Sequence, residues 1–600
     1  IANGDWSSDV CSSDLNSMRL LAFVVLLVAV LAKDYTSYSN LDCPGNDIHQ
    51  EKTQDVEKLK SICDSMDDCV GFNTHGWLKK ACPNAQVTPG VDAYLISSII
   101  IPTGEEPDML LWPMPVKYQG GDEVVAVDST NLRFHVNFES AEMTKAIQRF
   151  KQTIFTRRFA EAPEKAIREV DIMIENKEVV FETSKDESYG LAVPSDGSSI
   201  QITAKNIYGA YHALNSLMFL IQFNHDSATY IIKHAPIKVE DTPFLHYRAL
   251  MIDSARHYLP IPAIKRIIDS MAWIKLNVLH WHLVDDESFP IQVPSMPEMW
   301  KGAFSSQERY THWDIEEVVS YAKERGVHVV PEFDMPGHAN SWCKGKPEIC
   351  PSSECTTPLD PSTEATFEVT ETLMQDMLGG GRAEGLFPGQ YFHVGGDEVN
   401  TKCWEEVEHV KAWMAARNLT TTGAYGYFVN RVLEQVRGHG REAIAWEEVY
   451  NNHKASIPKD TIIHLWLGDG ENLKNIVNDG FRVIVSNYKH WYLPQLWETW
   501  DYYYGNDFLK DITKDQWHLI HGGEVCMWGE YVDISDFEAT IMPRTIAAAE
   551  RMWTQPELLD KDRAVIRFPY FRCEFNRRGI AASPAFGTGR SNPVGPGSCM

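Results

Sequence analysis

Two adjacent carboxylates, Asp397 and Glu398, follow a β-strand pattern and two glycines in the segment 391–398. Glycines let the backbone approach a ligand closely, and they place the carboxylates at the end of a strand rather than in a core. Carboxylates that share a site can act as an acid and a base when their environments separate their pKa values. The segment therefore predicts an acid–base pair, and a solvated acidic tip is the alternative interpretation.

Eight short apolar runs alternate with helical patterns over residues 244–585. Continuous apolar strands that alternate with helices indicate a parallel sheet, and eight of them predict a closed (β/α)8 barrel. The runs are Tyr247–Ser254, Asn277–Val284, His328–Phe333, Tyr391–Gly396, Glu442–Trp446, Ile462–Trp466, Arg482–Ser486 and Glu524–Trp528.

Each run ends in a polar or aromatic residue, at the edge where barrel enzymes place their chemistry. Three tryptophans among these residues predict aromatic walls around a ligand, although core packing is the usual role of a single strand tryptophan. A pocket that excludes water is expected to raise the pKa of Glu398, as a general acid requires. The end residues are Arg256, Asp285, His338, Asp397 with Glu398, Trp446, Trp466, Tyr492, and Trp528 with Glu530.

An α+β domain is predicted over residues 108–243, before a barrel that we place at residues 244–600. Two helical patterns alternate with strand-like runs, and Asn206 is a candidate cap of the helical run Asn206–Phe223. This domain has no cluster of histidines, cysteines or carboxylates, so we interpret it as structural. The strand-like runs are Asn131–Phe138, Val170–Glu175 and Ser199–Lys205.

The N-terminal region is expected to hold three different kinds of segment. Residues 1–17 resemble translated sequencing-adapter read-through, and we exclude them as an artefact. Residues 18–32 form a short apolar run after Met18 and Arg19, which predicts a cleavable secretory signal peptide. Residues 33–99 form a small disulfide-rich module with four cysteines that resembles a PAN/apple domain, which binds ligands and does no chemistry.

The charge balance and the signal peptide limit the partners and the location. The 55 basic and 83 acidic residues give a formal net charge of −28. Nucleic acids and anionic membranes bind basic surfaces, so the charge argues against both as partners. The signal peptide predicts a secreted or lysosomal protein without a stable membrane anchor, and Asn418 begins a sequon for N-glycosylation.

Five motifs give the chain a family resemblance over residues 111–599. The chain resembles the β-N-acetylhexosaminidases of glycoside hydrolase family 20, whose fold is a small α+β domain followed by a (β/α)8 barrel. The resemblance implies a retaining exo-glycosidase that removes terminal β-linked N-acetylglucosamine or N-acetylgalactosamine from glycans, without a cofactor. The motifs are Asp253-Ser254-Ala255-Arg256-His257-Tyr258, Leu279-His280-Trp281-His282-Leu283-Val284-Asp285-Asp286, Pro331-Glu332-Phe333-Asp334-Met335-Pro336-Gly337-His338, His393-Val394-Gly395-Gly396-Asp397-Glu398 and Trp528-Gly529-Glu530-Tyr531.

The resemblance implies that the substrate takes part in its own hydrolysis. In this family the acetamido carbonyl of the sugar attacks the anomeric carbon, which makes it an exception among glycosidases with paired carboxylates. Glu398 would protonate the leaving oxygen and then activate water. Asp397 would hold the acetamido N–H and stabilise the positive charge, and Tyr492 would hydrogen-bond the acetamido carbonyl.

Residues that hold the sugar or orient the catalytic pair follow from the same resemblance. Arg256 and Glu530 match positions that bind the outer hydroxyls, and a salt bridge between Arg256 and Asp285 is a second interpretation. Asp285 and His338 would orient the acid–base pair, with a structural histidine as the alternative.

One position departs from the family pattern. The family commonly has an aspartate two residues after the tyrosine that matches Tyr492, whereas this chain has Pro494. Proline cannot replace a carboxylate ligand, and Asp501 is a candidate substitute from the same loop. The departure leaves open the preference between glucosamine and galactosamine.

Other functions and assemblies are open. His280 and His282 share one face of a strand and invite a metal-site interpretation, but Trp446 and Trp466 occupy strand ends that would have to supply further ligands. We expect no metal and interpret both histidines as packing or hydrogen-bonding residues. A non-catalytic carbohydrate-binding protein on the same scaffold is the alternative function. Related eukaryotic enzymes are often dimers, which leaves a homodimer open.

Ten cysteines are candidates for disulfides in a secreted chain. The family resemblance implies Cys573–Cys599 and Cys355–Cys403, which leaves Cys343 with Cys350. In the N-terminal module Cys63–Cys69 and Cys43–Cys82 are the most plausible pairs. Cys526 lies in an apolar strand and is expected to be a buried free thiol.

Overall fold

The computed structural model describes most of the chain beyond residue 107 and parts of the region before it. The described residues are 35–38, 41–42, 47–66, 69, 71–79, 86–87, 91, 93–96 and 107–585, except 159, 179–180, 184, 381–382, 469 and 497. The chain divides into two compact units, Ile1–Ile101 and Pro102–Met600, which we describe separately. The predicted artefact, the signal peptide, Cys43, Cys82 and Cys599 lie outside the described residues.

The first unit is an antiparallel sheet with one helix. Helix α1 (Val56–Asp64) begins after Asp55, whose side chain accepts hydrogen bonds from two backbone N–H groups of the first turn. Leu59 of α1 packs with Phe72 and Leu78 of the sheet, and the predicted disulfide Cys63–Cys69 is present. The strand order is β1 (Tyr35–Tyr38), β7 (Ala93–Ile96), β4 (Gly71–Asn73), β5 (Trp77–Lys79) and β3 (Asp47–Gln50), and β2 (Leu41–Asp42) pairs separately with β6 (Gln86–Val87).

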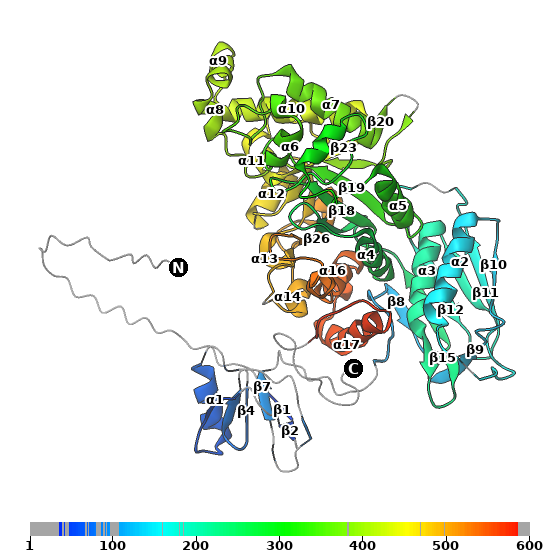
Figure 1. Ribbon diagram of the computed structural model, residues 1–600. Helices are drawn as coiled ribbons and strands as arrows, with labels where there is room; N and C mark the ends of the chain where they lie inside the picture. The colour runs from blue at the N-terminus through cyan, green and yellow to red at the C-terminus, as the bar shows by residue number, and fades with distance from the viewer. Residues whose placement is uncertain are drawn as a thin grey trace, which may run out of the picture. The chain divides into compact units, whose positions relative to one another are not determined.

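The α+β domain opens the second unit, with two helices on one face of a sheet (Figure 1). Asn206 caps α3 (Ile207–Leu220) by accepting from the N–H groups of Tyr208 and Gly209, as predicted. The helix α3 is buried nearly all round because it packs on the sheet and on α4 (Ile261–Trp273) of the barrel. The sheet order is β10 (Arg133–Val136), β11 (Glu169–Ile174), β13 (Ile200–Ala204), β12 (Tyr189–Val193), β16 (Ile237–Asp241) and β8 (Lys117–Gln119), and the other helix is α2 (Ala141–Ile154).

The predicted extent of α3 was wrong at its C-terminal end. We expected a helix to Phe223, but the helix ends at Leu220. Residues Ile221–Asn224 form β14, which pairs with β15 (Thr229–Ala235), and β15 pairs with β9 (Glu123–Val127). Strand pairing therefore overrides the helical pattern there.

The predicted (β/α)8 barrel is confirmed. Every neighbouring pair of its eight strands is parallel, and the barrel is closed by the pairing of β17 with β26. Seven of the eight predicted runs contain a barrel strand, and the eighth, Glu524–Trp528, overlaps β26, which begins at Ile520. The strands are β17 (Tyr247–Asp253), β18 (Val278–Val284), β19 (His328–Phe333), β22 (Tyr391–His393), β23 (Glu442–Trp446), β24 (Ile462–Leu465), β25 (Arg482–Val485) and β26 (Ile520–Met527).

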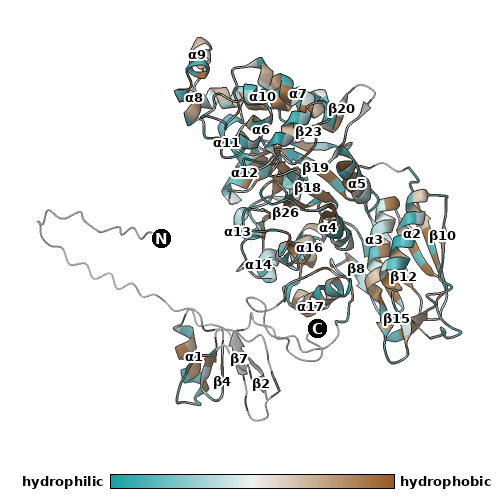
Figure 2. Ribbon diagram, in the orientation of Figure 1, coloured by the Kyte–Doolittle hydropathy of each residue, from teal (hydrophilic) through white to brown (hydrophobic). Residues whose placement is uncertain are grey.

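Helices surround the barrel and turn polar faces outward. In Figure 2 the central strands are mostly hydrophobic, and the surrounding helices carry hydrophilic faces. The main helices are α4 (Ile261–Trp273), α5 (His312–Lys323), α6 (Asn340–Gly345), α7 (Glu364–Leu378), α8 (Lys402–Glu406), α9 (Glu408–Ala416), α10 (Thr421–Gly438), α11 (Glu447–His453), α12 (Gly470–Asn478), α13 (Tyr488–Trp491), α14 (Trp500–Tyr504), α15 (Phe537–Ile541), α16 (Arg544–Trp553) and α17 (Lys561–Arg577). Among the described residues, no helix has both the length and the apolar character of a membrane span.

Disulfides brace the loops beside α6 and α8. Cys343–Cys350 and Cys355–Cys403 are both present, as predicted. Cys573 is disulfide-bonded, although its predicted partner Cys599 lies outside the described residues. Cys526 is a buried free thiol, as predicted.

Candidate active site

A glycine turn carries the two catalytic candidates over the end of β22. The backbone N–H of Gly396 donates to Asp334 Oδ1 at 2.9 Å. A Cβ on Gly395, whose φ is +69°, would lie 1.8 Å from the same oxygen, so only glycine fits over Asp334. Asp397 is 7 % exposed, whereas the side chain of Glu398 is 60 % exposed. The turn therefore buries one carboxylate and presents the other to solvent.

His338 lies between these carboxylates and Asp285. Its Nδ1 lies 3.1 Å from Asp285 Oδ1, and its Nε2 lies 3.6 Å from Asp397 Oδ2 and 3.5 Å from Glu398 Oε2. Burial alone would lower the pKa of His338, but the Asp397 charge and hydrogen bonds to Asp285 and Glu398 raise it well above its usual range. His338 is therefore an imidazolium that orients three carboxylates.

The expected rise in the pKa of Glu398 was wrong. The hydrogen bond from His338 lowers the pKa of Glu398, and the positive charges of His338 and Arg256 act in the same direction. Burial would raise this pKa, but much of the side chain is open to water. The prediction assumed an enclosed carboxyl and did not include the imidazolium beside it.

Two other carboxyls near Asp397 are arranged to keep their protons. Asp334 is fully buried, and burial and the Asp397 charge raise its pKa well above the usual range. Burial and the same charge raise the pKa of Glu448 to about 8. The environments therefore separate the pKa values of Asp334 and Glu448 from that of Glu398, which is how neighbouring carboxyls acquire different roles.

Arg256 is held by several carboxylates at the rim of the site. Its guanidinium lies 2.7 Å from Asp285, 3.0 Å from Asp253 and 3.1 Å from Glu287. Glu530 lies 3.8 Å away, and the guanidinium also lies over the ring of Trp528 at 5.1 Å. The salt bridge to Asp285 is thus confirmed, and Arg256 is fixed in place before a ligand binds.

The three tryptophans that are predicted to form aromatic walls lie near one another and beside Tyr492, and Trp446 is buried. The ring centroids of Trp446 and Trp528 are 6.0 Å apart, those of Trp528 and Tyr492 are 6.1 Å apart, and Tyr492 stacks on Trp466 at 6.1 Å. Glu448 accepts from Trp466 Nε1 at 3.0 Å. The four rings thus form a continuous aromatic group at the ends of strands β23 to β26.

Asp501 does not replace the aspartate that the family commonly has at the position of Pro494. Its Oδ2 lies 3.2 Å from Lys561 Nζ of α17, and Trp500 beside it stacks on Phe568. In the part of the chain that the structure describes, no contact joins Asp501 to the site. The carboxylates beside Arg256 are instead the candidates for binding outer hydroxyls.

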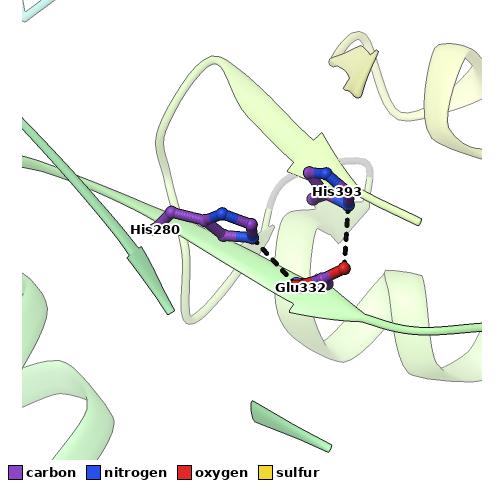
Figure 3. A group of neighbouring side chains, drawn as sticks. All are labelled: His280, Glu332 and His393. Atoms are coloured by element: carbon purple, nitrogen blue, oxygen red, sulfur yellow. Dashed lines mark ion pairs between the residues drawn. The ribbon is translucent and has the colours of Figure 1, made fainter. Parts of the chain in front are cut away.

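Close sets of histidines and carboxylates inside the barrel have metal-ligand residue types (Figure 3). His280 Nε2 and His393 Nδ1 each lie 3.1 Å from a Glu332 oxygen, and His280 Nδ1 lies 2.8 Å from Glu524 Oε1. Two ligands of a tetrahedral zinc ion lie about 3.3 Å apart or more, because each is about 2.0–2.1 Å from the metal. The separation between His280 Nδ1 and Glu524 fits a direct hydrogen bond, which confirms the predicted hydrogen-bonding role of His280.

The protonation of His280 predicts how the stability of the folded protein depends on pH. Burial alone would lower its pKa, but the charges of Glu524 and Glu332 raise it to about 9, compared with about 6.5 in an unfolded chain. Folding therefore favours the protonated form, and this contribution to the free energy of unfolding is complete below about pH 6.5 and is lost as the pH rises through about 9. Thermal unfolding of wild type and His280→Gln across this window measures the effect. The wild type should lose more stability than the variant, and equal losses would contradict the assignment.

The ten predicted catalytic and binding residues meet in one connected group, through the contacts of Arg256, His338 and the aromatic rings described above. Sequence reasoning did not single out the partners below and beside them. Glu332 and Asp334 stand within a motif that it did quote, so alternation along β19 was a usable signal. The partners are Asp253, Glu287, Glu332, Asp334 and Glu448.

Comparisons with known proteins agree with this geometry. Residues 245–556 match the family "Glycosyl hydrolase family 20, catalytic domain", and residues 111–220 match "beta-acetyl hexosaminidase like". Beta-hexosaminidase 3 of Arabidopsis thaliana is 44% identical over 72% of this chain and 80% of its own length. Beta-hexosaminidase 1 of the same plant is 38% identical over 84% of this chain and 96% of its own length.

A solved structure with the same architecture is the chitobiase of Flavobacterium johnsoniae. It is 28% identical, with a TM-score of 0.69, and the match covers 79% of this chain and 73% of that one. The PAN/apple resemblance of residues 33–99 lies before the matched families and stays a prediction. The chain therefore belongs to glycosyl hydrolase family 20, and its barrel is the catalytic domain of a β-hexosaminidase.

Proposed function

We propose that the chain removes terminal β-linked N-acetylglucosamine or N-acetylgalactosamine with retention, by using the acetamido group of the substrate as the nucleophile. The observation that supports this most is the different placement of two adjacent carboxylates. Asp397 is 7 % exposed, and the side chain of Glu398 is 60 % exposed. Adjacent side chains do not offer the separations by which paired carboxylates act on opposite faces of a sugar.

Each catalytic role follows from this placement. Glu398 reaches toward solvent, where a leaving group departs, and it donates the proton and later activates water. Asp397 accepts the acetamido N–H and offsets the positive charge that develops on the oxazolinium ring. Tyr492 donates to the acetamido oxygen, because burial raises its pKa well above the usual range and keeps the hydroxyl protonated.

Binding roles complete the proposal. Trp446, Trp466 and Trp528 enclose the acetamido methyl and one face of the sugar. Arg256 and Glu530 hold the outer hydroxyls, and Asp285 and His338 orient the proton donor. The ion pairs that fix Arg256 support this role, since a preorganised fork loses little freedom when it binds.

Hydrolysis of three aryl β-glycosides tests this proposal. Wild-type protein is expected to release the aryl alcohol from the N-acetylglucosaminide and the N-acetylgalactosaminide but not from the glucoside, which lacks the acetamido nucleophile. The ratio of the first two rates in wild type and Pro494→Asp measures what this position contributes to sugar preference. Binding of the sugars without hydrolysis would favour the alternative, a carbohydrate-binding protein.

We also propose where the enzyme acts, where it is glycosylated and how it assembles. The disulfides indicate the secretory pathway, and we propose a secreted or lysosomal enzyme that acts on glycans. Asn418 is exposed between α9 and α10 and is the proposed glycosylation site. Several Dictyostelium discoideum relatives are named as subunits, which supports an oligomer, and we propose a homodimer.

A further inference from the structure

Ionisable side chains fill a layer of the barrel interior where barrels usually pack branched apolar residues. Tyr247, Val330 and Ile444 belong to an apolar cluster within the barrel. On the barrel strands, the residues with fully buried side chains also include His280, His282, Glu332, His393, His464 and Glu524. Burying such charges is costly unless each has a partner of opposite charge.

These residues form a chain in which carboxylates and histidines alternate. His280 lies between Glu524, at 2.8 Å from its Nδ1, and Glu332, at 3.1 Å from its Nε2. His282 lies between Glu332, hydrogen-bonded at its Nδ1, and Asp285, at 2.9 Å from its Nε2. Figure 3 shows Glu332 between His280 on one side and His393 on the other.

The pattern of acceptors fixes the charge of His282. An ionised carboxylate only accepts hydrogen bonds, so a ring with a carboxylate at each nitrogen has to donate from both and is an imidazolium. Burial lowers the pKa of His282, but Glu332 and Asp285 raise it well above the usual range. The charges of these side chains therefore alternate from Glu524 to Asp285, with a histidine cation between each two carboxylates.

Asp285 connects these buried side chains to the catalytic pair. One of its oxygens is hydrogen-bonded to His282 at 2.9 Å and forms an ion pair with Arg256 at 2.7 Å. Its other oxygen lies 3.1 Å from His338, which contacts Glu398. Glu332 also accepts from Trp446 Nε1 at 2.8 Å, so it joins the proton-donor side of the site to the aromatic wall.

We propose that Glu332 is a positioning residue for the proton donor: it fixes His282, and through it Asp285 and His338, so that Glu398 meets the leaving oxygen. This inference rests on the proposed function. Glu332 touches no reacting atom, and its effect should therefore appear where proton donation limits the rate. A residue that merely holds the barrel together would affect all substrates alike.

The test compares Glu332→Gln on two aryl β-N-acetylglucosaminides. One carries a strongly acidic phenol, which leaves without a proton, and the other carries a weakly acidic phenol, which needs one. General acid catalysis contributes about 10²–10⁴-fold, so the variant is expected to lose about 10- to 100-fold in kcat/KM on the second substrate and clearly less on the first. His282→Gln breaks the same chain at its next member and should show the same split.

Controls separate this role from a loss of folding. Glu550 is as deeply buried as Glu332 and pairs with Arg567 at 2.7 Å, without a contact to the site. Glu550→Gln should lower the unfolding temperature while leaving the ratio of the two rates as in wild type. Equal losses on both substrates in Glu332→Gln and His282→Gln would overturn the inference. A wild type that hydrolyses neither substrate would instead overturn the proposed function.

Discussion

Glu398→Gln is expected to lower kcat/KM for aryl β-N-acetylglucosaminides with weakly acidic phenols by about 10²–10⁴-fold, the usual contribution of a general acid. Glutamine has the same shape but cannot give up a proton at this position. The loss should be smaller for a strongly acidic phenol, and steady-state kinetics with both substrates measure the difference. Glu398 is half-exposed and only weakly held, so the unfolding temperature should stay close to that of wild type.

A matched control for this substitution lies in the same β22–α10 connection. Glu406 of α8 is an exposed carboxylate, and Glu406→Gln should leave kcat/KM unchanged on both substrates. Wild-type activity in Glu398→Gln would contradict the assignment of the proton donor. Equal losses for both phenols would assign Glu398 a role other than protonation.

Asp397→Asn is expected to lower kcat by about 10²–10³-fold, the loss that follows removal of one electrostatic partner of a transition state. Asparagine keeps the size of the side chain but cannot offset the positive charge of the oxazolinium ring. The effect should fall mainly on kcat, because the charge develops after the substrate has bound. Kinetics with both N-acetyl sugars measure it.

The unfolding temperature of Asp397→Asn is a second, independent measurement on this variant. The Asp397 charge raises the pKa values of Asp334 and Glu448, so folding holds acidic groups together at some cost. Asp397→Asn lowers the cost of keeping these two carboxyls neutral but also removes the charge that pairs with His338, so the unfolding temperature should stay close to that of wild type. A large loss of stability would indicate a structural role, and retained kcat would contradict the proposed mechanism.

The barrel and the strand-end residues could be predicted because their signals are local. Apolar runs and the residues that follow them are adjacent in sequence, so the topology alone brings Arg256, Asp397 and Trp528 to one edge. The cap of α3 at Asn206 was predictable for the same reason. The extent of α3 was not, since Ile221–Asn224 pairs with a strand.

The buried carboxyls and their charges could not be predicted, because they depend on contacts between distant segments. Glu332 and Trp446 are 114 residues apart in sequence, so the motif that contains Glu332 does not show which residues it contacts. The pKa of Glu398 depends on His338 of another strand end. The suggested role of Asp501 failed because Lys561 of α17 pairs with it.

The most direct test of substrate-assisted catalysis varies the acetamido group itself. Aryl β-glucosaminides are compared in which the 2-acyl group is acetyl or trifluoroacetyl, with the phenol unchanged. Fluorine withdraws electrons from the carbonyl oxygen, so kcat/KM is predicted to fall steeply with the trifluoroacetyl substrate if that oxygen is the nucleophile. Equal kcat/KM values, together with a glycosyl group trapped on a protein carboxylate, would contradict the account.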